Sequence, residues 1–141
     1  MEKRLEYTTT LGYMNHNPTN IRYSENNKWQ GQIGSSKGFC VFNSEIMCYR
    51  ATTKIIKKYI DRGENTVEKI ITLWAPKSEN PTEAYVRFIC TKTGIKRNRP
   101  LSIYERRLIV AIIVAMTAFE CRRYYPPISY VEAGYDLAVT E

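Results

Sequence analysis

A single acidic residue at the end of a long apolar run is the most chemically suggestive feature of this sequence. Glu120 follows the stretch from Leu108 to Phe119, in which only Thr117 is polar. A helix of that composition is buried on nearly all sides, so a carboxyl at its C-terminus is partly removed from water and close to the negative end of the helix dipole. Both effects raise the pKa of the carboxyl. A carboxyl that stays protonated near neutral pH is what a general acid for glycosidic bond cleavage requires.

A structural interpretation of the same residue stays open. Glu120 would then be a surface side chain at a frayed helix end, paired with Arg122 or Arg123. Shifted pKa values occur at structural ion pairs as well as at active sites. Taken alone, the apolar run favours this structural interpretation.

Metal-dependent chemistry is not expected, because the possible ligands are few and scattered. His16 is the only histidine, and no two cysteines form a C-x-x-C pair. Zinc sites need closely spaced ligands. We therefore expect no metal and no other cofactor, and no Ser-His-Asp arrangement. Free thiols are favoured over disulfides at the four cysteines, which are Cys40, Cys48, Cys90 and Cys121.

Turn and capping signals divide the chain into helices with one short strand. Four pairs match the capping box, in which an Asn or Ser is followed three residues later by Glu: Asn65 with Glu68, Asn80 with Glu83, Ser102 with Glu105, and Ser129 with Glu132. The predicted helices span about residues 44–62, 66–74, 80–94, 102–121 and 129–139, and the predicted strand spans 38–42. The first helix should bury a stripe made of Met47, Ala51, Ile55, Tyr59 and Ile60.

The N-terminal third has less regular patterning. Residues 8–10 suit a strand or an extended lead-in, and residues 14–22 are rich in the asparagine and proline of turns. Residues 34–36 read as a further loop. An aromatic-rich and asparagine-rich loop region suits the wall of a groove that recognises hydroxyls and amides.

Length and charge set broader bounds. The 141 residues suit one domain, 1–141, and the net charge of +7 suggests an anionic partner. The first residues have no apolar segment of the signal-peptide type, so no signal peptide is expected. The apolar run before Glu120 is shorter than the roughly 20 residues that span a bilayer, so no transmembrane segment is expected.

Several phrases, in a fixed order, resemble the N-P-G-N-I-R proteins of phages and prophages, which are often described only as structural or virion proteins. Some members of that group are similar to lysozyme-fold lysins that cut the peptidoglycan glycan strand. The resemblance covers about residues 13–125. The phrases occupy residues 15–22 (NHNPTNIR), 29–31 (WQG), 38–42 (GFCVF), 49–51 (YRA), 65–76 (NTVEKIITLWAP) and 79–86 (ENPTEAYV).

The resemblance implies a mainly α (α+β) fold, lysozyme-like, with a helical core and a small extended N-terminal lobe. The segment 17–21 is also similar to a segment of bacterial glucosaminidases that follows the helix bearing the catalytic Glu. Here the corresponding helix comes last in the sequence. A circularly permuted arrangement would place Glu120 across a cleft from the loop 15–22.

The implied activity is cleavage of peptidoglycan by a lytic transglycosylase or muramidase-like enzyme, with Glu120 as the catalytic acid. Family members close the late helix with His-Glu-Asn-Gly, whereas this chain has Phe119, Glu120, Cys121 and Arg122. Thr19 and Cys48 also stand where the family has Gly. The implied partners are bacterial peptidoglycan and other virion proteins. The implied location is the phage virion, or the bacterial cytoplasm before delivery to the periplasm.

Substrate-binding residues are predicted in the loop region and on one helix. Trp29, Tyr23 and Tyr85 would stack on sugar faces, while the hydrogen-bonding groups would come from Asn17, Asn20, Arg22 and Gln32. Asn17 and Asn20 equally suit loop-building caps. Trp74 is expected in the core rather than in a groove. The candidates for a second carboxylate are Glu25, Glu45 and Glu79, none of which forms an obvious pair with Glu120, so substrate-assisted chemistry is weakly favoured.

Two other classes of function compete with the enzyme. One is an inactive phage structural or assembly protein on the same scaffold, because a fold does not carry its activity with it. The other is a nucleic-acid-binding module that uses the basic residues between 92 and 107. Those residues lack the interleaved aromatics of a single-strand binder, which favours a solvated face over a nucleic-acid site.

Overall fold

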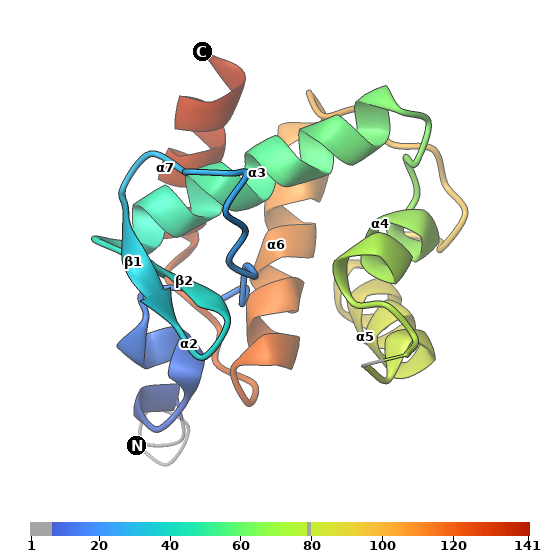
Figure 1. Cartoon of the computed structure of the whole chain (residues 1–141). Coiled ribbons are helices and arrows are strands. Elements are labelled where there is room, and N and C mark those ends of the chain that lie inside the picture. The colour runs from blue at the N-terminus through green and yellow to red at the C-terminus, as the bar shows by residue number, and fades with distance from the viewer. Residues whose placement is uncertain (1–6, 79) are drawn as a thin grey trace.

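The chain forms a mainly helical α+β structure with a two-stranded sheet near its N-terminus (Figure 1). The computed structural model describes residues 7–78 and 80–141. Among the helices in these ranges, none is both long enough and apolar enough to cross a membrane. The elements are α2 (Leu11–Met14), β1 (Gln32–Ser36), β2 (Phe39–Phe42), α3 (Glu45–Asp61), α4 (Val67–Trp74), α5 (Thr82–Thr93), α6 (Arg106–Glu120) and α7 (Ile128–Val139).

The apolar helix α6 lies at the centre, as its composition predicts. It packs against both α5 and α7 and buries eight of its side chains. Its one polar interior residue, Thr117, is fully buried and shares a hydrogen bond of 3.0 Å with the hydroxyl of Tyr49 on α3. That bond satisfies both hydroxyls in a place where an unpaired one would be costly. The helix begins later than predicted, because the Ser102–Glu105 pair forms a separate turn before it.

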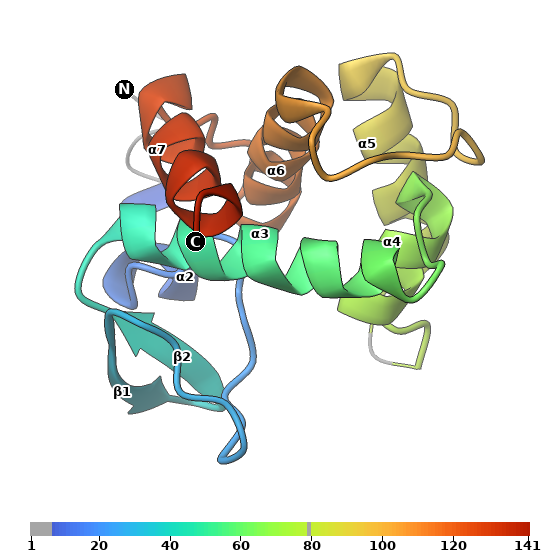
Figure 2. The same ribbon diagram turned by 90° about the horizontal axis from the view of Figure 1, so that it is seen from above.

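Helix α3 is the longest element and crosses the molecule beside α6 and α7 (Figure 2). The Ser44 hydroxyl caps its first turn, and Gly63 follows its end with φ +89°. The predicted buried stripe is only partly right. Ala51 is buried, but the other four members are half-exposed, and the buried positions are Cys48, Tyr49, Ala51, Thr52, Thr53 and Ile56. The buried face of α3 differs from the predicted one because this helix packs against α7 and its Cys48 and Thr52 form a polar cluster with the N-terminal loop.

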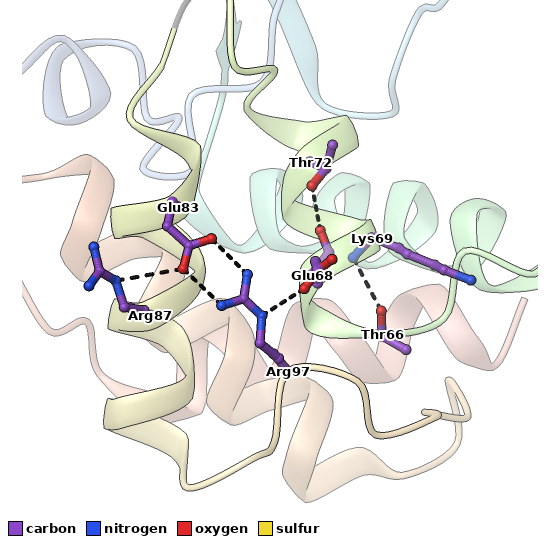
Figure 3. A network of polar contacts seen from close by, with 7 residues as sticks. All are labelled: Thr66, Glu68, Lys69, Thr72, Glu83, Arg87 and Arg97. Atoms are coloured by element: carbon purple, nitrogen blue, oxygen red, sulfur yellow. Dashed lines mark hydrogen bonds and ion pairs between the residues drawn. The ribbon is translucent and has the colours of Figure 1, made fainter.

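Helices α4 and α5 form the end of the molecule farthest from the sheet (Figure 1). Thr66, not Asn65, caps α4 through its hydroxyl, and Gly94 ends α5 in the left-handed conformation. Arg97 joins the two helices (Figure 3). Its guanidinium donates to Glu68 of α4 at 2.6 Å and to both carboxylate oxygens of Glu83 of α5 at 2.7 and 2.8 Å.

The N-terminal lobe contains more regular structure than the sequence predicts. The strand at 38–42 is confirmed as β2, but residues 34–36 belong to its partner β1 and not to a loop. Lys37 and Gly38 both have positive φ, as two-residue hairpin turns require. Residues 8–10 form no strand, and Thr10 caps the short helix α2 with its hydroxyl.

Candidate functional site

The carboxyl of Glu120 lies at the last position of α6 and is held by two side chains from other elements. Its Oε1 accepts a hydrogen bond of 3.0 Å from Nδ2 of Asn20, and its Oε2 accepts one of 2.9 Å from the hydroxyl of Tyr85. Burial raises the pKa of this carboxyl, while both hydrogen bonds and the charge of Arg22 act in the opposite direction. The raised pKa agrees with the sequence prediction, whereas the loop 15–22 contacts the carboxyl directly through Asn20 and not across a cleft. The surface ion pair with Arg122 or Arg123 is not formed.

Tyr85 supports the carboxyl and cannot stack on a ligand. Its side chain is 1% exposed and its ring stacks on Phe119 of α6, with centroids 4.0 Å apart and planes inclined by 20°. The predicted role of Tyr85 in sugar stacking is therefore wrong, because both faces of the ring lie inside the protein. Its hydroxyl has an upward-shifted pKa, caused by burial and by the adjacent Glu120 carboxyl, so it acts as a hydrogen-bond donor.

Asn17 builds the loop that presents Asn20. Its Nδ2 donates to the carbonyl oxygens of Ile21 and Cys40, both at 3.0 Å, and its Oδ1 accepts from the Ile21 amide at 2.9 Å. The side chain has no exposed surface, so the prediction that Asn17 binds substrate is wrong. Asn20 itself has φ +56°, a left-handed conformation that Asn tolerates better than most residues.

A buried polar cluster fastens the same loop to α3 and α4. The hydroxyl of Thr19 lies 2.8 Å from that of Thr52 and 3.4 Å from the sulfur of Cys48, and its carbonyl accepts a bond of 3.2 Å from the Trp74 indole. Burial raises the pKa of Cys48 to about 12, so the thiol is neutral. The cysteines of the chain are all free, as predicted. Thr19 and Cys48 thus fill one packed contact.

A pocket of about 290 Å³ lies beside this loop. The loop and the segment after it contribute Asn20, Arg22 and Trp29, three of the residues predicted to bind substrate. The full lining is Asn20, Ile21, Arg22, Asn27, Trp29, Ile55, Lys58, Tyr59, Arg62, Leu73 and Trp74. Glu120 does not line the pocket. Asn20 connects the pocket to Glu120, because this residue lines the pocket and its side chain donates a hydrogen bond to the Glu120 carboxyl.

The remaining predicted residues lie outside the pocket. Tyr23 is 41% exposed, and Gln32 accepts a hydrogen bond from the Trp29 amide at 3.1 Å, so it shapes the loop. Neither lines the pocket. Trp74 was expected in the core; it packs there with one part of its ring and lines the pocket with another.

The residues that sequence reasoning missed are those that α3 contributes. Ile55, Lys58, Tyr59 and Arg62 recur at intervals of three and four, so they share one face of the helix. The spacing of Ile55 and Tyr59 was the sequence signal for this face. That spacing predicted that these two residues belong to a buried stripe and not to a pocket.

Among the proposed second carboxylates, Glu45 accepts a hydrogen bond from Tyr7, and Glu25 is exposed without lining the pocket. Glu79 lies outside the described residues. None of the described residues lining the pocket is acidic. The site thus offers one carboxyl, two supporting donors and an adjoining basic and aromatic pocket.

Comparison with known proteins places this chain among phage proteins. Protein P5 of Pseudoalteromonas phage PM2 is 32% identical to it over 110 residues, a match that spans 74% of this chain and 69% of that protein. The chain belongs to the family of that phage protein. No protein-family model matches the chain. The phage relationship predicted from the sequence phrases is therefore confirmed, whereas the likeness to lysozyme-fold lysins remains a prediction.

Proposed function

We propose that this protein cleaves the glycan strand of bacterial peptidoglycan, with Glu120 as the general acid, as part of a phage particle. The observation that carries the proposal is the state of Glu120: a partly buried carboxyl with a raised pKa, held by Tyr85 and by Asn20, which itself lines the neighbouring pocket. A helical body beside a small sheet-containing lobe is also the arrangement expected of a permuted lysozyme-like fold.

In the proposed reaction, Glu120 gives its proton to the glycosidic oxygen while the bond from that oxygen to the sugar C1 breaks. The carboxylate that remains takes a proton from the hydroxyl that then bonds to C1. Because the described residues place one carboxyl at the site, a substrate group assists at C1, which favours the transglycosylase reaction over a two-carboxylate hydrolysis. Asn20 keeps the carboxyl oriented, and Tyr85 donates to the oxygen that becomes charged.

Digestion of purified sacculi tests this proposal. Wild-type protein is expected to release soluble fragments, and Glu120→Gln should reduce the rate by a factor of about 10² or more. Glu132→Gln, which removes a carboxyl that pairs with Arg106 and does not line the pocket, is the matched control and should remain active. Mass spectrometry of the fragments distinguishes an internal anhydro sugar from a free reducing end. Intact sacculi after incubation with wild-type protein would refute the enzyme.

A second candidate is a non-enzymatic structural protein of the phage particle. The observation that favours it is that Asn20 and Tyr85 each occupy one oxygen of Glu120, which itself does not line the pocket. On this candidate the carboxyl only joins α5 and α6 to the loop. Glu120→Gln would then change the stability of the protein, and no wild-type preparation would release fragments from sacculi.

A further inference from the structure

The pocket beside Asn20 has a charge pattern that a neutral sugar does not require. Arg22 projects from the loop, Lys58 lies in the last turn of α3, and Arg62 follows four residues later as the C-cap of that helix. These three cations share the lining with no acidic residue of the described chain. Neither Lys58 nor Arg62 forms an ion pair with a described residue, whereas the neighbouring Lys57 is paired with Asp61.

The apolar part of the pocket is aromatic and fixed in place. The indole nitrogen of Trp74 is bonded to the Thr19 carbonyl, which holds the ring against the pocket. The Arg62 guanidinium lies over the Tyr59 ring, 5.5 Å from its centroid. Such stacking keeps an arginine extended while leaving its N–H groups available to an anion. Leu73 adds apolar surface and is 37% exposed.

The amides of Asn20 and Asn27 complete the lining. Aromatic faces pack on sugar rings, amides bond to hydroxyl and acetamido groups, and cations bind carboxylates through charge-assisted hydrogen bonds. A ligand that uses all three has a saccharide part with a carboxylate-bearing substituent. In peptidoglycan, that substituent is the short peptide carried on alternate sugars.

Given the glycan-strand substrate proposed above, we propose that this pocket is a subsite for the carboxylates of the peptide stem, bound by Lys58 and Arg62. The protein then selects peptide-bearing glycan over a bare or neutral polysaccharide. The subsite reaches the acid through Asn20, which both lines the pocket and holds Glu120.

A binding experiment with an inactive variant separates this subsite from catalysis. Glu120→Gln protein is sedimented with three probes: sacculi lacking wall phosphate polymers, the same sacculi stripped of peptides by an amidase, and chitin. Binding to intact sacculi should be at least about tenfold tighter than binding to the other two probes, as loss of two charge-assisted contacts predicts.

The pocket variant carries Lys58→Gln and Arg62→Gln in the same background. It should bind intact sacculi about as weakly as the parent binds stripped sacculi. The matched control carries Lys96→Gln and Arg107→Gln, which remove the same two charges from a separate hollow at the start of α6. This control should bind like the parent, and thermal melts verify that all variants are folded.

The proposal is overturned if the parent binds stripped and intact sacculi equally, or if the control loses as much affinity as the pocket variant. A protein that binds intact sacculi selectively but releases no fragments in the wild-type form would keep this subsite and lose only the proposed catalysis.

Discussion

Nδ2 of Asn20 donates a 3.0 Å hydrogen bond to Oε1 of Glu120, across a sequence separation of 100 residues. The bond joins the N-terminal loop to the C-terminal end of the central helix. Because the same Asn20 lines the pocket, whatever occupies the pocket is one side chain away from the carboxyl. The ionisation of Glu120 and the position of the loop are thereby physically linked.

The raised pKa of Glu120 makes stability depend on pH in a defined direction. Below about pH 4, the ordinary pKa of Glu, the carboxyl is protonated in both the folded and the unfolded chain. As the pH rises toward the folded-state pKa, only the unfolded chain releases the proton, so wild-type stability falls. Glu120→Gln removes this effect. Its melting temperature relative to wild type should therefore increase between about pH 4 and pH 8, and a decrease over that range would contradict the burial of the carboxyl.

Tyr85→Phe should raise the pKa of Glu120 further. The Tyr85 hydroxyl stabilises the ionised carboxyl, so its removal disfavours ionisation while the stacked ring is kept. The loss of stability should be about 1 kcal/mol, the usual net value of one hydrogen bond. Carbon-13 NMR titration of the Glu120 side chain measures the pKa directly. Tyr13→Phe, at an exposed ring, is the control and should leave it unchanged; a lowered pKa in Tyr85→Phe would refute the assignment.

Asn17→Ala should be strongly destabilising, because it leaves the buried Ile21 amide without the acceptor Oδ1 and removes the Nδ2 hydrogen bonds to the carbonyls of Ile21 and Cys40. Each buried group left unpaired costs about 1–3 kcal/mol. Asn26→Ala, at an exposed position of the same lobe, is the control and should change stability little. Denaturant unfolding measures both. Equal stability of the two variants would mean that Asn17 does not organise the loop.

The sequence predicted the parts of the fold that depend on local chemistry. A long run of apolar residues indicates a buried helix, so both α6 and the burial of Glu120 could be predicted. Ser44 and Gly63, at the ends of α3, are equally local signals. Only the second strand of the hairpin was predicted. The first strand, Gln32–Ser36, is mostly exposed, consists mostly of glycine and serine, and has no apolar alternation.

The capping boxes failed for a reason that the sequence does not display. Three of their four glutamates bind an arginine far along the chain: Glu68 and Glu83 bind Arg97, and Glu132 binds Arg106. Glu105 binds the nearby Arg99. Only Glu105 also accepts its box hydrogen bond, from the Ser102 amide. Nonlocal ion pairs therefore replaced a local motif.

The burial of Glu120 and the loop residues that line the pocket, Asn20, Arg22 and Trp29, were predictable from the sequence, whereas the supporting residues and the face of α3 were not. Asn17 and Tyr85 have the composition of ligand-binding residues, and only burial shows that they support the loop and the carboxyl instead. Lys58 and Arg62 become pocket residues because α3 turns one face toward the loop and α4, a relation that no local pattern encodes.

Arg97→Gln should lower the melting temperature slightly at low salt and leave it unchanged at high salt. Arg97 bridges α4 and α5 through Glu68 and Glu83 at the surface, where dissolved ions screen the attraction (Figure 3). Lys69→Gln, a nearby exposed cation without an ion pair among the described residues, should have little effect at either salt concentration. A salt-independent loss in Arg97→Gln would show that the bridge acts by packing and not by charge.

Gly134→Ala tests the close contact between α7 and α3. An added Cβ would lie 2.5 Å from Cβ of Tyr49 and 2.7 Å from the Arg50 amide nitrogen, so the helices must separate. Alanine favours a helix interior by up to about 1 kcal/mol over glycine. The steric cost of about 1–3 kcal/mol should nevertheless prevail and lower the free energy of unfolding. Gly34→Ala, whose Cβ would meet no atom within 4 Å, should be neutral or mildly stabilising. If Gly134→Ala instead stabilised the protein against denaturant, the gain in helix propensity would exceed the steric cost. In that case α7 could not pack on α3 as closely as the structure shows.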